Sequence, residues 1–142
     1  TKDMFKATMK MQSKRSAGKT IASTAPRVVG CPADKDALGR GTWELIHTIC
    51  ANYPASPEEE DKRRVREFFE SLAALYPCPY CAEDFQKNIK ASPPRLDSKE
   101  ALSVWACQQH NIVNRKLGKP VVACDVAALN ERYRSGHPSC WS

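Results

Sequence analysis

The sequence has no long hydrophobic run. Nowhere in its 142 residues do apolar side chains approach the roughly 18 in succession that a membrane-spanning helix needs. It also lacks the shorter apolar core of a signal peptide. No segment alternates strictly between apolar and polar residues, as a half-buried β-strand does. These absences predict a chain without a membrane span, built from helices.

Acidic residues are scarce and cysteine is absent in residues 1–30, which hold seven Lys or Arg and one Asp. Residues 31–142 contain fifteen basic and fifteen acidic residues, so the net charge of +6 belongs to the first segment. Nucleic-acid binding needs a basic face on the folded part of the protein. The balanced charge of residues 31–142 therefore argues against a nucleic-acid-binding protein. We expect residues 1–30 to be a disordered basic arm, loosely similar to an organellar transit segment, and residues 31–142 to be the functional domain.

Proline and capping residues divide this domain into helices. A first helix is predicted over residues 34–53, with Asp34 as its N-cap and Pro54 after its end. A second begins with Ser56 as the cap, Pro57 at the first helical position and Glu59 closing a capping box. Its apolar stripe, at helical spacing, consists of Val65, Phe68, Phe69, Leu72 and Leu75.

Three more helices are predicted toward the C-terminus. Cys78 and Pro79 repeat the pattern of a capped start, for a helix that ends near Ala91. Residues 97–100 form a capping box for a helix that ends near Leu117, and a short helix follows over residues 125–133. Short loops between helices make neighbours antiparallel. The predicted fold class is therefore all-α, a four-helix bundle with a short fifth helix.

The stretch CPYC, residues 78–81, raises the question of dithiol chemistry. A glutaredoxin has this motif between a strand and a helix, but here a helix precedes it and no strand follows. Zinc is a second interpretation, since Cys78, Cys81, Cys107 and His110 form two doublets with the ligand types of a Cys3His site. These doublets lie on long helices rather than in a small loop-rich module, which makes zinc the weaker reading.

A CxxC bridge also makes a poor structural staple, because it closes a very short and easily reduced loop. A thiol at a helix N-terminus meets the positive end of the helix dipole, which favours the thiolate. A redox role for the CxxC pair is therefore favoured over a purely structural one. The electrons must go to another disulfide, as in a flavin-free thiol–disulfide carrier, or to a two-electron cofactor.

Two helix faces carry polar and aromatic groups that suit a ring-shaped ligand. Cys107, His110, Asn111 and Asn114 share one face of the fourth predicted helix. On the first helix, Trp43 and His47 are four residues apart, with Arg40 one turn before. Such faces either meet solvent or line a flavin or nucleotide ring by stacking and hydrogen bonding.

Several ordered motifs resemble those of the Erv/ALR sulfhydryl oxidases. Residues 39–47 (GRGTWELIH) resemble the family's GRxxWxxxH, and Tyr53-Pro54 follows at the same distance. Residues 76–81 (YPCPYC) resemble YPCxxC, and residues 105–120 (WACQQHNIVNRKLGKP) resemble WxCxxHNxVNxxLxKP. Cys107 and Cys124 enclose sixteen residues, like the family's CX16C. Five motifs in register over residues 31–142 make the resemblance specific; it does not extend to the basic arm.

The resemblance implies a FAD-dependent thiol oxidase that forms disulfides in dithiol substrates, with FAD bound noncovalently at the mouth of the bundle. Cys78 would exchange with incoming dithiols from an exposed position, and Cys81 would face the flavin. Electrons would pass to O2, giving hydrogen peroxide, or to cytochrome c. The implied FAD-binding residues are Gly39, Arg40, Gly41, Trp43, His47, Tyr53, Cys107, His110, Asn111, Asn114, Lys116, Leu117, Lys119 and Tyr133.

The resemblance also assigns the other cysteines, of which the chain has seven. Cys107 and Cys124 enclose sixteen residues and would form a structural disulfide. Cys31 and Cys140 would link the two subunits of a homodimer, and Cys50 is left as a buried free thiol. No metal ligands are expected.

The family implies partners and a compartment as well. Substrates would be dithiol proteins, among them an oxidoreductase of the mitochondrial import disulfide relay. The mitochondrial intermembrane space is the expected compartment, with the secretory pathway or a viral origin as alternatives. Two departures stand out: Val122 replaces the aromatic of the family's KPxFxC, and Tyr133 replaces the Trp of its Arg-Trp pair.

Overall fold

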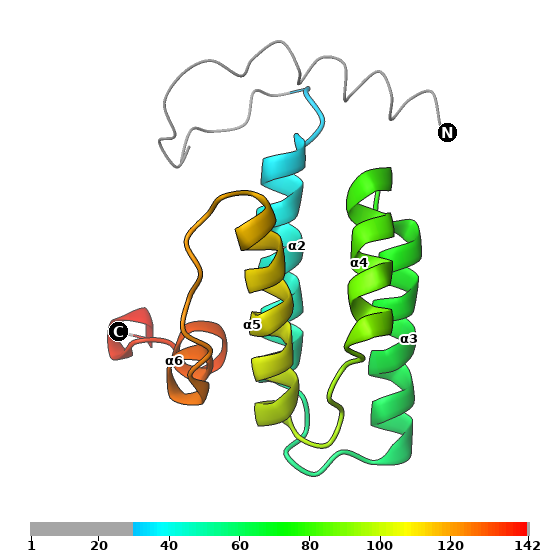
Figure 1. Cartoon of the computed structure of the whole chain (residues 1–142). Coiled ribbons are helices and arrows are strands. Elements are labelled where there is room, and N and C mark those ends of the chain that lie inside the picture. The colour runs from blue at the N-terminus through cyan, green and yellow to red at the C-terminus, as the bar shows by residue number, and fades with distance from the viewer. Residues whose placement is uncertain (1–29, 142) are drawn as a thin grey trace. The chain divides into compact units, whose positions relative to one another are not determined.

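The computed structural model of the chain describes residues 30–141 (Figure 1). Apart from Gly30, the predicted basic arm lies outside these residues. The chain divides into two units, residues 1–41 and 42–142, and the first long helix runs through this boundary. The expected division at residue 30 stays a prediction.

The described part of the chain is entirely helical, with no strand among residues 30–141, which confirms the predicted all-α class (Figure 1). None of its helices is long and apolar enough to cross a membrane. Its elements are α2 (Lys35–Ala51), α3 (Glu59–Leu75), α4 (Pro79–Ala91), α5 (Lys99–Lys116), α6 (Val126–Asn130), the π-helical turn η1 (Glu131–Ser135) and the 3-10 turn η2 (Pro138–Trp141).

Helix starts agree with the sequence in two places. The carboxylate of Asp34 accepts a hydrogen bond from the N–H of Ala37 at 2.7 Å, as the N-cap of α2 should. Cys78 caps α4: its sulfur lies 3.4 Å from the N–H of Cys81, and Pro79 takes the first helical position. The redox motif itself therefore starts α4.

Two other starts were predicted wrongly. The cap of α3 is Glu58, not Ser56. Glu58 and Asp61 form a reciprocal capping box, in which the Asp61 carboxylate accepts from the Glu58 N–H at 2.9 Å. The cap of α5 is Ser98, whose hydroxyl accepts from the Ala101 N–H at 3.1 Å. In both places neighbouring residues compete for the same orphan amides, and spacing alone cannot choose between them.

The core of the unit formed by residues 42–142 joins α2, α3, α4 and α5. The α3 stripe is buried as predicted at Val65 and Phe69, but Leu75 is 79% exposed. Leu75 lies two residues beyond buried Ala73, about 200° around the helix, and so points away from the core. The buried core residues are Ile46, Cys50, Tyr53, Val65, Phe69, Leu96, Leu102, Trp105 and Ala106.

A disulfide and a glycine turn hold the C-terminal segment. Gly118, at φ 67°, ends α5. Cys107 and Cys124, the pair assigned to a structural disulfide, are disulfide-bonded across a separation of 17 residues. Asp125 then caps α6 through a 2.9 Å bond from the N–H of Ala128. The predicted last helix is present but is split into α6 and η1.

Candidate functional site

Cys78 and Cys81 form a disulfide at the N-terminus of α4, with their Cα atoms 5.2 Å apart. Because both sulfurs lie in the first turn, the positive end of the helix favours a thiolate once the bridge is reduced. The exposure of the pair differs from the expectation: Cys81 is exposed, whereas Cys78 is half-buried. The redox pair is thus open to a large ligand on the Cys81 side.

Four rings from three elements meet in a cluster consisting of Trp43, His47, His110 and Tyr133, here called the ring cluster. Trp43 of α2 stacks on His110 of α5, with ring centroids 4.2 Å apart and planes within 3°. His47 stacks on Tyr133 of η1 at 4.5 Å and 13°. The two imidazoles are joined by a 2.9 Å contact between Nε2 of His47 and Nδ1 of His110. The structure therefore brings together four of the predicted FAD-binding residues.

Both imidazoles are uncharged at neutral pH. Burial, then His110 and Arg132, lower the pKa of His47 from 6.5 to about 4. Burial, then Arg132 and Lys119, lower the pKa of His110 to about 4 as well. A neutral pair can share one proton along the 2.9 Å contact, one ring donating and the other accepting. A second proton would leave two donors facing each other.

The lowered pKa values of these two histidines predict that the stability of the folded state depends on pH. The unfolded chain takes up these protons near pH 6.5, but the folded chain only near pH 4. The unfolded state therefore binds more protons in this window, and the free energy of unfolding should fall as pH drops from about 6.5 to about 4. Urea unfolding midpoints measured across that range check the prediction.

The matched control uses the third histidine, His137, which is exposed. His47→Gln should flatten the pH dependence, whereas His137→Gln should leave it as in the parent protein. An equally flat curve for both variants would assign the dependence to other groups.

Phe85 connects the ring cluster to the redox helix. It lies one turn after Cys81 on α4, and its ring meets the edge of Trp43 at 6.2 Å and 72°. The disulfide and the ring cluster are thus neighbours through a single aromatic contact. Phe85 was not predicted as a site residue, although its i+4 spacing from Cys81 was a usable signal.

The polar residues that share one face of α5 contact two different parts of the structure. His110 joins the ring cluster, whereas the amide of Asn111 is taken up by the segment that follows α5. Asn111 donates to the carbonyl oxygen of Val122 at 2.8 Å and accepts from its N–H at 3.0 Å. Asn114 adds a 3.4 Å bond to Asn111. Together with the Cys107–Cys124 bridge, Asn111 clamps residues 119–124 against α5.

Among the described residues, the other predicted site residues make no ring contact with the ring cluster. Tyr53 is buried in the core, and its hydroxyl donates to the carbonyl oxygen of Leu96 at 3.0 Å. Lys116 pairs with Asp84 of α4. Leu117 is 58% exposed at the end of α5. Residues 39–41 belong to the other unit of the chain, on the first half of α2.

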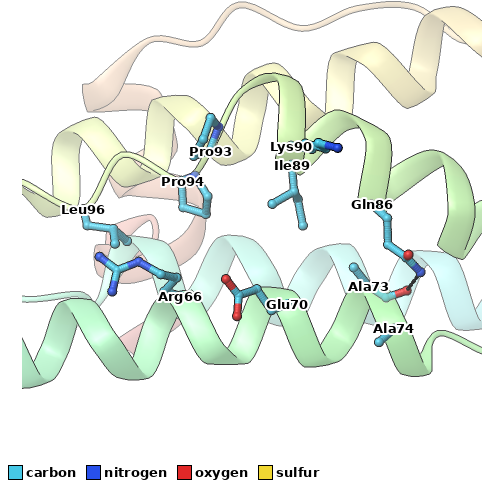
Figure 2. A pocket seen from close by; sticks show the side chains of 10 residues that line it. All are labelled: Arg66, Glu70, Ala73, Ala74, Gln86, Ile89, Lys90, Pro93, Pro94 and Leu96. Atoms are coloured by element: carbon cyan, nitrogen blue, oxygen red, sulfur yellow. Dashed lines mark hydrogen bonds between the residues drawn. The ribbon is translucent and has the colours of Figure 1, made fainter.

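A groove lies between α3 and α4 (Figure 2). It has a volume of about 620 Å³, and at one end the Gln86 amide donates to the carbonyl oxygen of Ala73 at 3.0 Å. It contains no member of the redox pair or the ring cluster. Its lining residues are Arg66, Glu70, Ala73, Ala74, Gln86, Ile89, Lys90, Pro93, Pro94 and Leu96.

The arrangement does not favour the zinc interpretation. Cys78 pairs with Cys81 and Cys107 pairs with Cys124, so three of the four proposed ligands are in disulfides. Among residues 30–141, no three His, Cys, Asp or Glu side chains are grouped so that they could hold a metal ion.

Comparison with protein families gives a match to the Erv1 / Alr family over residues 40–134. The chain belongs to the Erv1/Alr family. The match includes the redox pair, the ring cluster and the Asn111 clamp, so the residues with the most distinctive geometry all lie inside the family domain. The resemblance read from the sequence motifs is confirmed.

Named members of the family include close relatives of this chain. The mitochondrial FAD-linked sulfhydryl oxidase ERV1 of Saccharomyces cerevisiae is 42% identical over 105 residues, 74% of this chain and 54% of the relative. The FAD-linked sulfhydryl oxidase ERV1 of Oryza sativa is 44% identical over 102 residues, 72% of this chain and 52% of the relative. A probable FAD-linked sulfhydryl oxidase of Acanthamoeba polyphaga mimivirus is 34% identical over 83 residues, 56% of this chain and 58% of the relative.

Solved Erv1 structures share the fold. The yeast Erv1 core superimposes with a TM-score of 0.73 at 38% identity, covering 82% of this chain and 96% of that one. The FAD binding domain of Erv1 from Saccharomyces cerevisiae gives a TM-score of 0.70 at 38% identity, covering 75% of this chain and 99% of that one. The chain spans about half the length of the first curated relatives it matches.

Proposed function

We propose that this protein is a FAD-linked thiol oxidase that forms disulfides in dithiol protein substrates. The observation that carries the proposal is the Cys78–Cys81 disulfide at the start of α4, inside a domain of the Erv1/Alr family. Names of the relatives, FAD-linked sulfhydryl oxidases, support the same activity.

The residues near the redox pair fit FAD. Trp43, His110, His47 and Tyr133 offer flat faces for stacking on heteroaromatic rings. Near them, Lys119 and Arg132 supply positive charge that suits phosphates: both lower the pKa of His110. Finally, the buried side-chain oxygen of Gln109 has no hydrogen-bond partner among the described residues, and a bound ring N–H would satisfy it.

The chain's own residues carry the thiol chemistry. A substrate thiolate attacks one sulfur of the Cys78–Cys81 bridge, forming a mixed disulfide and releasing the other sulfur as a thiolate. The second substrate thiol then displaces the mixed disulfide. The substrate leaves oxidised, and Cys78 and Cys81 are left reduced with its two electrons. We assign exchange with substrate to Cys78 and the position facing FAD to Cys81, whose exposure leaves room for a large group.

When bound, FAD would supply the two-electron chemistry that no side chain can, taking the electrons of the reduced pair on to O2 or, one at a time, to two molecules of cytochrome c. The remaining FAD-site assignments made from the sequence, including Arg40, Tyr53 and Lys116, belong to this proposal. Asn111 and Asn114 would act mainly by holding residues 119–124 in place.

The proposal extends to the compartment and the natural substrate. The mitochondrial name of the yeast relative supports the intermembrane space, with an oxidoreductase of the import disulfide relay as the substrate, although a viral relative also exists.

We further propose a homodimer linked by Cys31 and Cys140, both of which are exposed and unpaired within the described chain. Cys31→Ser should remove the covalent dimer band on a non-reducing gel and leave the reducing lane unchanged. A dimer band that persists in this variant would contradict the bridge.

The test of the function is an absorbance spectrum of the purified protein from 300 to 700 nm, recorded before and after addition of dithiothreitol. A flavin band that bleaches with the thiol and returns in air would establish cofactor and cycle together. A colourless protein that binds no added FAD would contradict the proposal; with bound metal it would point to a zinc module, and without metal to a flavin-free thiol carrier.

A further inference from the structure

Gln109 is an unusual residue in the interior of this domain. Its side chain is 2% exposed, among the largest that are fully buried. Its Oε1 atom is the one buried side-chain oxygen or nitrogen without a hydrogen-bond partner in the described part of the chain. Because a buried acceptor that lacks a donor destabilises the folded state, such a group usually has a partner that the protein alone does not provide.

The position of Gln109 on α5 shows which helix it faces. Trp105, four residues earlier, donates from its ring N–H to the carbonyl oxygen of Ser92 at the end of α4. Lys116, seven residues later, pairs with Asp84 near the start of α4. Residues at these spacings share one face of a helix. Gln109 therefore points between these two contacts, toward the stretch of α4 that follows Cys81.

Gln109 is next in sequence to one residue of the candidate cofactor site and faces the helix that carries another residue in contact with that site. His110, the next residue, is part of the ring cluster, and Phe85, one turn after Cys81, touches Trp43 of that cluster. The face of α5 that carries Gln109 is thus turned toward the helix that carries both the redox pair and Phe85. A flavin ring beside Cys81 would offer this region the imide N–H, the only N–H of the oxidised ring system.

We propose that Gln109 is a flavin-positioning residue, whose buried Oε1 accepts a hydrogen bond from the imide N–H of the bound flavin. The proposal rests on the FAD-linked function proposed above. It adds a residue at a position that the motif WxCxxHNxVNxxLxKP leaves unspecified, and it explains why a polar amide is buried there.

The test compares Gln109→Leu with Gln108→Leu, the same change one residue away at an exposed position. Three quantities are measured: the thermal midpoint of the FAD-free protein, the FAD dissociation constant and the flavin midpoint potential. Gln109→Leu should leave the thermal midpoint unchanged or raise it, because it removes an unpaired acceptor. It should weaken FAD binding on the order of tenfold, because the imide N–H is then buried unpaired.

The flavin midpoint potential distinguishes a hydrogen bond to the flavin ring from a hydrogen bond to the adenine. A carbonyl dipole at the imide makes the ring harder to reduce, so its loss should raise the potential, and Gln108→Leu should change none of the three quantities. If Gln109→Leu lowers the thermal midpoint and leaves FAD affinity intact, the amide has a structural partner and the proposal is wrong. Weaker binding at an unchanged potential would place the bond on the adenine amino group and would also overturn it.

Gln109→Met, which is unbranched and closer in length, repeats the comparison if the Leu variant folds poorly. A parent protein that binds no FAD would refute the proposed function itself. That outcome is distinct from any difference between the variants.

Discussion

Replacing either Cys78 or Cys81 with serine is expected to abolish thiol oxidation, with a loss on the order of 10³-fold or more. The two sulfurs form one disulfide, and thiol–disulfide exchange needs both: one to form the mixed disulfide and one to leave as thiolate. A serine hydroxyl can do neither at neutral pH. Substrate turnover, followed by loss of free thiol, measures the effect.

Both variants should keep their FAD. Stacking groups lie on α2, α5 and η1, and the Asn111 clamp holds residues 119–124 without help from the redox pair. The visible spectrum of each variant should therefore still show the flavin band. Its bleaching by dithiothreitol should be slow, since the reductant has lost its entry through the bridge.

The matched control is Cys140→Ser, the same change at an exposed free cysteine outside the redox pair. It should turn over substrate at the rate of the parent protein. Full activity in Cys78→Ser or in Cys81→Ser would show that the bridge is not the entry point of electrons, and the assigned roles would fail.

Local signals predicted the start of the redox helix, because cap and first turn are set by adjacent residues. Cys78 followed by Pro79 was sufficient to place the beginning of α4. The start of α3 was misplaced, since Ser56 and Glu58 both offer cap oxygens and the structure uses the latter. Helical spacing also predicted that His110 shares a face with Asn111, but not that their side chains serve different partners.

Sequence patterns could not predict the contacts between segments that are far apart in the chain. Stacking of His47 on Tyr133 needs η1 to return to α2, which no spacing rule encodes. Tyr53 fits a family motif, yet its hydroxyl bonds to Leu96 in the core. Gln109 was missed because it shares a face with Trp105 and so falls within the apolar pattern; its unpaired oxygen becomes visible only when its surroundings are known.

Trp105→Ala is expected to destabilise the domain by about 3–5 kcal/mol. The Trp105 side chain is 0% exposed, packs edge-on against Phe69 with centroids 4.8 Å apart, and donates to the carbonyl oxygen of Ser92 at 2.9 Å. Alanine leaves a cavity the size of an indole and an unpaired carbonyl oxygen near the end of α4. Urea unfolding, followed by far-UV circular dichroism, measures the change.

The chain offers a matched control in Trp141, which makes the same kind of bond, from its ring N–H to the carbonyl oxygen of Ser135 at 2.7 Å, but is 76% exposed. Trp141→Ala should change the free energy of unfolding by no more than about 0.5 kcal/mol. Equal losses in the two variants would mean that the hydrogen bond, and not burial, carries the stability. The total free energy of unfolding of a domain this size is only about 5–15 kcal/mol, so the loss expected for Trp105→Ala is a large fraction of it. FAD binding should then weaken as well, since Trp105 fixes the helix that carries His110 and Gln109.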